Sequence, residues 1–373
     1  MEYKECKRCL FNSDIDENII INEDGICNHC QSYDNKKKYL RNLSIESNEV
    51  KQIVKYIKER NRNSKYDCII GLSGGIDSSY SAYLLVKMGL NPIAVHFDNG
   101  WNSELAVMNI KNLVQKLNID LLTYVVDWQE FKDLQLSYLK ASVVDIEAIT
   151  DQAISATLIK VAKKLKIKTI ISGANHRTEG TLPDGWTYIK SDDRNIRDIH
   201  KKFGKKKLKT YPIVGYFKRY FIQRFKLIET IDILDLIKYE KEEAKYILEK
   251  EMGWRDYGGK HYESIFTRFY QAYILPVKFK IDKRYSHYST LICAGQITKE
   301  EAKKKLNEPI CDPELLQKDK LYVCKKLELS IKEFDELMLL KPKSHLEYKN
   351  IYQILRFMKI FKISLKKMFR NKF

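Results

Sequence analysis

The residues best suited to chemistry are Ser73-Gly74-Gly75-Ile76-Asp77-Ser78, which follow the apolar run Cys68–Leu72. This order predicts a strand, a tight glycine turn and the start of a helix. Two adjacent glycines let the backbone approach an anion, and the free N–H groups of a helix N-terminus bind phosphate oxygens. The segment lacks the lysine of the G-x-x-x-x-G-K-[ST] loop, so it predicts a phosphate site of another type.

Four cysteines form a second candidate site. Cys6-x2-Cys9 is followed by Cys27-x2-Cys30, a spacing typical of zinc sites with four thiolate ligands. Four protein ligands fill a tetrahedral shell, so we predict a structural zinc ion. His29 is the one substitute ligand nearby, and a redox dithiol pair or an iron–sulfur cluster remains an alternative. The remaining cysteines are expected to be reduced core thiols: Cys68, Cys293, Cys311 and Cys324.

The elements that must position the first site alternate between strand and helix patterns. Strands are expected at residues 67–71, 93–98, 121–126 and 168–172. Helices are expected at residues 78–88, 104–117, 129–139 and 146–165. Helical crossovers between strands predict an α/β fold with a doubly wound parallel sheet, in which ligands bind at the carboxyl ends of the strands.

The glycine loop resembles the pyrophosphate-binding loop of the PP-loop ATPases, a HUP-like class. The resemblance implies that ATP, with Mg²⁺, is split into AMP and pyrophosphate and that a substrate oxygen is adenylated. It implies catalytic roles for Ser73 and Asp77. The nucleotide contacts that it implies are made by Gly71, Ser73, Gly74, Gly75, Asp77 and Ser78, by Phe97 and Asp98 at the end of the second strand, and by Gly173 and Asn175 after the fourth.

A third informative stretch is Trp254–Ser264, in which a glycine pair precedes Lys260, His261 and Glu263. Positive side chains follow it downstream, and such groups suit a pyrophosphate leaving group or an anionic substrate. His261 or Glu263 is suited to take a proton from attacking ammonia. We predict catalytic roles for His261, Glu263, Lys283 and Arg284.

Three features together resemble the N-acetyl sugar amidotransferases of surface-polysaccharide, O-antigen and nonulosonic-acid biosynthesis, which are WbpG-like and related to the pseudaminic acid amidotransferase. They are the cysteine knuckle, the SGGIDSS loop followed by His-Phe-Asp-Asn-Gly-Trp-Asn-Ser, and the Trp254–Ser264 run with Asp282-Lys283-Arg284 after it. The resemblance spans roughly residues 6–300. It implies conversion of a sugar acetamido group to an acetamidino group, and it leaves open whether the sugar is free, nucleotide-linked or lipid-linked.

Ammonia is scarce at neutral pH, and the sequence shows no glutaminase nucleophile, because it has no cysteine at position 2 and no G-x-C-x-G elbow. The resemblance therefore implies separate subunits, a HisH-like glutaminase and a HisF-like ammonia channel. The rival class is a PP-loop tRNA thiolase, which shares the loop and often a zinc knuckle. Thiolases commonly need a further cysteine pair beside ATP, and here the other cysteines are isolated. A knuckle adaptor with a degenerate ATPase is the third class.

The 373 residues carry a net charge of +18, which suits an anionic partner or lysine-rich solvated faces. We expect a cytoplasmic protein with nucleic acid an unlikely partner. The expected domains are a zinc knuckle (1–33), an ATPase core (34–185), a substrate and ammonia region (186–310) and a helical basic C-terminal region (311–373). Apolar and basic residues at helical spacing in 351–373 suit peripheral membrane contact or packing on the body.

Overall fold

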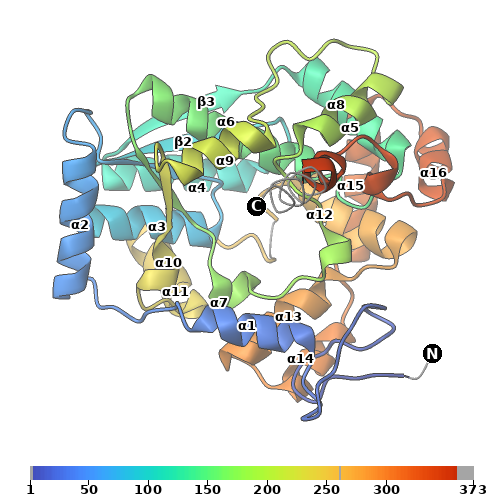
Figure 1. Ribbon diagram of the computed structural model, residues 1–373, viewed down its shortest axis with the longest axis horizontal. Coiled ribbons are helices and arrows are strands. Elements are labelled where there is room, and N and C mark those ends of the chain that lie inside the picture. Colours follow the sequence, from blue (N-terminus) through green and yellow to red (C-terminus); the bar gives the residue numbers. More distant parts are fainter. Residues whose placement is uncertain (1–2, 260–261, 359–373) are drawn as a thin grey trace, which may run out of the picture.

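A computed structural model describes residues 3–259 and 262–358. Its sheet is parallel throughout, in the order β3-β2-β1-β4-β5 (Figure 1). The strands are β1 Cys68–Gly71, β2 Pro92–Asp98, β3 Asp120–Val125, β4 Thr169–Ser172 and β5 Glu229–Asp232. The chain moves outward from β1 to β3 and then returns to the other side of β1, so the strand order reverses beside the glycine loop.

Both faces of the sheet are covered, because neighbouring residues of a strand point to opposite sides. Ile69 and Ile170 pack against α6 (Ala148–Lys164) on one face. Ile70 and Ile171 pack on the other face, in a core shared with α2 (Asn48–Arg60) and α3 (Ile76–Lys87). The near-continuous apolar runs of the inner strands follow from this double burial.

The remaining helices surround this core. They are α1 Asn28–Lys37, α4 Glu104–Leu117, α5 Trp128–Ala141, α7 His176–Glu179, α8 Asp193–Phe203, α9 Tyr216–Arg224, α10 Ile233–Leu236, α11 Lys241–Met252, α12 Ile265–Phe269, α13 Lys283–Ala294, α14 Lys299–Leu306, α15 Pro313–Leu327 and α16 Ile331–Leu339. Short 3₁₀ turns occupy Asp184–Trp186 and His345–Glu347, and a π-helix, η2, occupies Tyr270–Phe279.

The predicted α/β alternation is confirmed, and each expected strand and helix of the core is present with its ends shifted by two residues or fewer. The fifth strand was missed. β5 is four residues long, carries a polar residue at each end and lies at the sheet edge. It follows residue 185, where the core was expected to end, so the α/β unit continues into the region that we assigned to the substrate.

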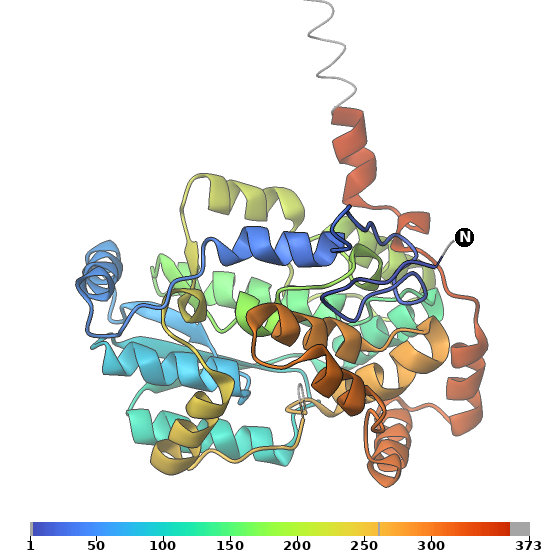
Figure 2. The same ribbon diagram turned by 90° about the horizontal axis from the view of Figure 1, so that it is seen from below.

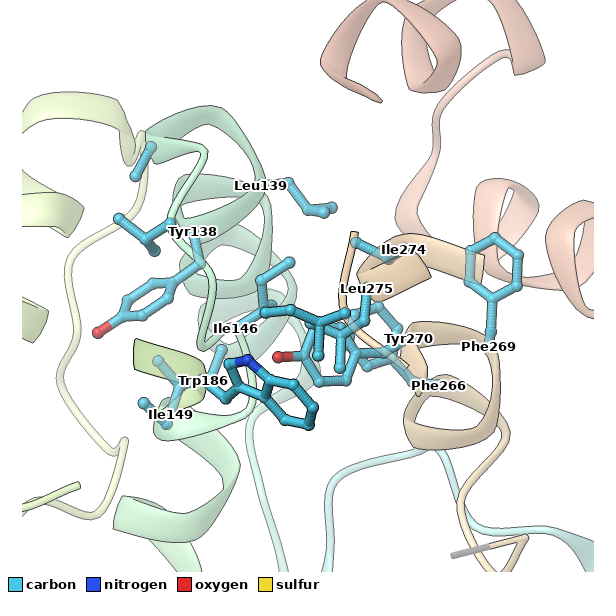
Figure 3. Packing of buried hydrophobic residues seen from close by; sticks show 14 of the residues in the cluster. Tyr138, Leu139, Ile146, Ile149, Trp186, Phe266, Phe269, Tyr270, Ile274 and Leu275 are labelled. Atoms are coloured by element: carbon cyan, nitrogen blue, oxygen red, sulfur yellow. The ribbon is translucent and has the colours of Figure 1, made fainter. Parts of the chain in front are cut away.

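The C-terminal half packs against the core through a dense apolar cluster (Figure 3). Figure 3 shows Tyr270 and Phe266 facing Ile146 and Ile149, with Trp186 between the two sets of helices. Tyr270 also donates a hydrogen bond from its hydroxyl to the Val144 carbonyl, at 2.6 Å. This contact fixes α12 and η2 against the segment that leads into α6.

The basic segment Lys201–Lys209 folds onto two carboxylates. The backbone N–H groups of Lys205 and Lys206 donate to Asp133, and that of Lys209 donates to Glu130. These bonds lower the pKa of both carboxyl groups against the opposing effect of burial. The main chain of this lysine-rich stretch is therefore held by the protein's own acids.

At the C-terminal end, residues 351–358 are helical and project away from the body (Figure 2). Ile351 is buried, whereas Phe357 is exposed. The greater part of the basic stretch that we assigned to membrane contact, residues 359–373, lies outside the described residues. Among the described residues, none of the helices is both long and apolar enough to span a bilayer.

Candidate active site

The glycine loop joins the carboxyl end of β1 to the N-terminus of α3. Gly74 has a φ of +85°, and a Cβ at this position would lie 2.7 Å from the Ala106 carbonyl oxygen of α4. Only glycine combines that backbone conformation with so close an approach. The indole Nε1 of buried Trp254 donates to the Gly74 carbonyl at 2.8 Å. The Trp254–Ser264 run is thereby tied to the loop.

The loop serines organise the start of α3, whose N-cap, Gly75, has no side chain to bind the free N–H groups. The hydroxyls of Ser73 and Ser78 lie 3.1 Å apart, and the Ser73 Oγ accepts a hydrogen bond from the Gly75 N–H at 3.2 Å. A Cβ on Gly173 would lie 3.0 Å from the Ser78 nitrogen. The end of β4 thus approaches the helix N-terminus as an anion site of this type requires.

Asp77 lies in the first turn of α3 and accepts a hydrogen bond from the hydroxyl of buried Tyr239. Burial first, and then the negative charge of Asp77, raise the pKa of Tyr239 well above its ordinary value. Tyr239 therefore stays a proton donor and fixes one carboxylate oxygen of Asp77.

Two cavities lie at the loop and adjoin a third, whose lining includes no loop residue. The nucleotide cavity, about 540 Å³, lies over the ends of β1, β2 and β4 and includes Ser73, Phe97 and Gly173. The loop cavity, about 390 Å³, includes Asp77, Ser78 and Gly75. The acceptor cavity, about 630 Å³, is formed mainly by the C-terminal half and includes Arg268 and Arg284. Glu263 lines the first two, and Lys283 lines the first and third.

Two of the residues expected at the nucleotide have structural partners instead. Asp98 accepts hydrogen bonds from the Gly100 N–H at 2.8 Å and the Asn102 side-chain amide at 3.0 Å, so it shapes the turn after β2. Asn175 caps α7 by accepting from the Thr178 N–H at 2.9 Å. By contrast, Gly71 and Phe97 line the nucleotide cavity.

The expected catalytic groups of the third stretch occupy different environments. Glu263 lies beside the loop, with Oε1 3.5 Å from a Cβ built on Gly75. The Lys283 ammonium group forms no ion pair or hydrogen bond with the described residues, and burial lowers its pKa. Arg284 binds Asp282 and donates to the carbonyls of Lys305 and Glu308. His261, the remaining prediction, lies outside the described residues.

A group of charged residues lies where the nucleotide and acceptor cavities meet; the sequence predicted Lys283 among them but did not reveal Asp145, Glu147 or Lys190. Asp151, Lys190 and Lys283 line both cavities, whereas Asp145 and Glu147 line the first. Lys190 is paired with Asp145 and with Asp151, at 3.1 Å from the latter. A short acidic pattern before a helix was the only signal, and such patterns are common at helix starts.

The four predicted thiols converge. The Sγ atoms of Cys6, Cys9, Cys27 and Cys30 all lie within 4.8 Å of one another and are buried. The Cys6–Cys30 and Cys9–Cys27 sulfur distances are 3.8 and 3.5 Å. Tetrahedral zinc with Zn–S bonds of about 2.3 Å needs sulfurs roughly 3.8 Å apart, so the donor set fits such an ion. His29 instead contacts Asp16 at 2.6 Å.

The cysteine knuckle packs on α13, the helix that begins with Lys283. Leu10 donates its N–H to Ser289 Oγ at 3.2 Å, and Arg8 donates to the Cys293 carbonyl at 3.1 Å. The Cys293 Sγ lies 3.5 Å from that of Cys30. Figures 1 and 2 both show α1, which begins within the knuckle and carries Cys30, beside α13. A metal held here would stabilise one wall of the acceptor cavity.

Two family models match the chain. The NAD synthase family matches residues 46–206, which include the glycine loop. The C-terminal domain of the WbpG-like LPS biosynthesis proteins matches residues 263–362, beginning at Glu263 and including the acceptor wall. The fold and the loop thus define a PP-loop protein of the ATP-pyrophosphatase type. The second match is to the C-terminal domain of the WbpG-like proteins, so the two matches together support a WbpG-like PP-loop protein.

Individual proteins are more distantly similar. An uncharacterized protein of Methanocaldococcus jannaschii is 27% identical over 323 residues, 84% of this chain and 96% of that protein. The tRNA-specific 2-thiouridylase MnmA 2 of Clostridium botulinum is 25% identical over 193 residues, half of each chain.

Two solved structures share less with the chain. The match to NMN synthetase from Francisella tularensis covers 58% of this chain and 90% of the synthetase chain, with 17% identity and a TM-score of 0.31. U34-tRNA thiolase NcsA from Methanococcus maripaludis, with its 4Fe–4S cluster, covers 83% and 90%, with 14% identity and a TM-score of 0.33.

Proposed function

We propose that this protein is an ATP-dependent, AMP-forming amidotransferase that converts the acetamido group of an N-acetylated sugar to an acetamidino group. The amide oxygen attacks the α-phosphorus of ATP, and pyrophosphate leaves. Ammonia then adds to the imidate carbon, and the C–O bond to AMP breaks. The nitrogen remains on the sugar, and the original amide oxygen departs in AMP. Adenylation is needed because an amide oxygen is otherwise a poor leaving group.

One observation carries the proposal. The Trp254–Ser264 run is anchored on the glycine loop, and the WbpG-like domain begins within it at Glu263. The Glu263 carbonyl accepts from the Ser103 N–H at 2.8 Å, and the Ile265 N–H donates to the Trp101 carbonyl at 2.8 Å. The domain that distinguishes this family therefore starts against the phosphate loop and forms the wall of an adjoining cavity. This arrangement suits transfer from ATP to a family-specific acceptor.

In this reaction the loop N–H groups and the hydroxyls of Ser73 and Ser78 would bind pyrophosphate oxygens. Asp77, fixed by Tyr239, is suited to hold Mg²⁺ or to orient the phosphates. Lys283 has no ion-pair partner among the described residues and lies between the nucleotide and acceptor cavities. Its charge is placed to stabilise an oxyanion that develops between nucleotide and acceptor. Zinc at the cysteine knuckle would have a structural role.

We further propose that ammonia comes from separate glutaminase and ammonia-channelling subunits. A free ammonium pool is mostly protonated at neutral pH and reacts slowly, so a channelled source would raise the rate. We place the reaction in surface-polysaccharide, O-antigen or nonulosonic-acid synthesis on the strength of the WbpG-like domain.

The test uses wild-type protein, ATP, Mg²⁺, ammonium chloride and a panel of free, nucleotide-linked and lipid-linked N-acetyl sugars. The expected result is sugar-dependent AMP and pyrophosphate, with a product in which NH replaces O. A sugar labelled with oxygen-18 in its acetamido group should transfer that label to AMP. AMP formation that depends on tRNA and a sulfur donor, but on no sugar, would instead establish the thiolase that the 2-thiouridylase similarity keeps as the second candidate.

A further inference from the structure

Glu147 occupies an unusual position at the start of α6. It is the N-cap residue of that helix and lines the nucleotide cavity. Its Oε2 accepts a hydrogen bond from the Thr267 hydroxyl of α12, at 2.8 Å. This carboxylate therefore lies at the contact between the NAD synthase-like core and the WbpG-like domain, which carries Thr267.

Two other polar side chains near Glu147 lack hydrogen-bond partners among the described residues. Thr150, one helical turn further along α6, lines the cavity at 9% exposure, and its buried hydroxyl is unpartnered. Gln271 lines both the nucleotide and the acceptor cavity, and its amide has no partner in the described chain. Gln271 belongs to the π-helix η2, a rare conformation that is frequent at functional sites.

The charges around Glu147 leave it without an ion pair. Asp145 and Asp151 both bind Lys190, and Lys283 approaches from α13 without pairing with any described residue. Burial, reinforced by the nearby charge of Asp151, raises the pKa of Glu147 to about 7. The Thr267 hydrogen bond and the charge of Lys190 act in the opposite direction. A carboxyl group with this pKa accepts a proton readily at neutral pH.

We propose that Glu147 is the base that deprotonates the attacking ammonia, in a small polar site completed by Thr150 and Gln271. This inference rests on the proposed amidotransferase reaction and replaces the sequence-based choice between His261 and Glu263. Ammonia adds to the carbon of the adenylated imidate and forms a C–N bond, which leaves an ammonium group on that carbon. One proton passes from this nitrogen to the Glu147 carboxylate. The nitrogen lone pair then expels AMP as the C–O bond breaks, and the proton is released to solvent.

The surrounding packing holds this site in place. Ile146 and Ile149 flank Glu147, and Tyr270 and Ile274 flank Gln271, and all four belong to the cluster in Figure 3. The segments that carry Glu147 and Gln271 are more than 100 residues apart in the sequence, but they pack against each other in this cluster. A fixed base in the nucleotide cavity, together with the Gln271 amide that lines both cavities, suits a nucleophile that must reach an adenylated sugar.

The experiment compares Glu147→Gln with wild type in two half-reactions. Gln retains an oxygen for the Thr267 hydroxyl but cannot take up a proton. Sugar-dependent exchange of labelled pyrophosphate into ATP reports adenylation without ammonia, and it should remain near the wild-type rate. Amidine formation with ammonia should fall by about 10²–10⁴-fold, the usual contribution of a general base. Glu336→Gln, the same change at an exposed position on α16, should leave both rates unchanged.

Two further measurements separate a base from a structural role. At constant free ammonia, the wild-type rate of amidine formation should rise with pH through about 7, and Glu147→Gln should lose this limb. Hydroxylamine, whose adduct loses its proton more easily, should restore much of the variant's rate. Wild-type amidine formation by Glu147→Gln, or an equal fall in exchange and amidine formation, would overturn the assignment. Absence of sugar-dependent exchange in the wild type would instead refute the proposed function itself.

Discussion

Gly74→Ala is the sharpest test of the glycine loop, because the chain offers a matched control at Gly89. Both glycines have positive φ, +85° and +76°. An alanine at either position therefore incurs a similar backbone strain, about 1–2 kcal/mol. The surroundings differ: a Cβ on Gly74 would lie 2.7 Å from the Ala106 carbonyl, whereas a Cβ on Gly89 meets nothing within 4 Å.

The two variants should therefore lose similar backbone stability but differ in function. The Ala106 oxygen belongs to the backbone of α4, so the loop must shift to relieve the contact in Gly74→Ala. A displacement of about 1 Å at a catalytic site costs roughly 10²-fold in rate. We expect a loss of that size in sugar-dependent pyrophosphate release for Gly74→Ala, and a rate close to wild type for Gly89→Ala.

Two measurements complement the rate assay. Thermal unfolding compares the stability of the two variants, and the backbone strain should lower both midpoints by about 1–3 °C. Calorimetric titration with α,β-methylene ATP, which cannot be cleaved at the relevant bond, compares nucleotide affinity independently of the acceptor. Affinity should be strongly reduced only in Gly74→Ala. If Gly74→Ala binds the analogue and turns over like wild type, then the close approach of this loop to α4 does not position the phosphates.

Three further predictions concern the loop, the knuckle and a buried histidine. Ser73→Ala removes a hydroxyl that accepts from the Gly75 N–H, and it should lower pyrophosphate release by about 10²–10³-fold with an unchanged circular dichroism spectrum; an unaltered rate would exclude Ser73 from the site. Cys27→Ser should abolish the bound zinc measured by mass spectrometry, whereas Cys293→Ser, beside the cluster, should retain it; full metal content in Cys27→Ser would place the ion elsewhere. Burial lowers the pKa of His345 to about 4, below its ordinary 6.5, so the folded state favours the neutral ring. The free energy of unfolding should therefore fall by about 3 kcal/mol as the pH drops from 6.5 towards 4. A His345→Gln variant that shows the same pH dependence would contradict this assignment.

The sequence alone determined the local features of this protein. The spacing of apolar residues differs between buried strands and amphipathic helices, and it can be read from the sequence. The strands and helices of the core that we expected were therefore predicted to within two residues. The spacing of Cys6, Cys9, Cys27 and Cys30 likewise predicts that the four sulfur atoms lie close together, because each C-x-x-C turn places two thiols on the same side of the chain. The glycine loop was also predictable, because its conformation is set by its own residues and by the strand and helix that flank it.

The tertiary structure decided what depends on distant segments. β5 is too short and too polar to show a strand pattern, and it becomes a strand only through pairing with β4. The sequence predicts Arg284 to be a catalytic cation. In the folded chain its guanidinium instead binds Asp282 and a carbonyl just after α14. The acidic pattern before α6 does not single out Glu147, because burial between α6 and α12 raises its pKa and Thr267 lies 120 residues further along the chain. Desolvation and long-range charge are properties of the surroundings that folding creates, and no local pattern encodes them.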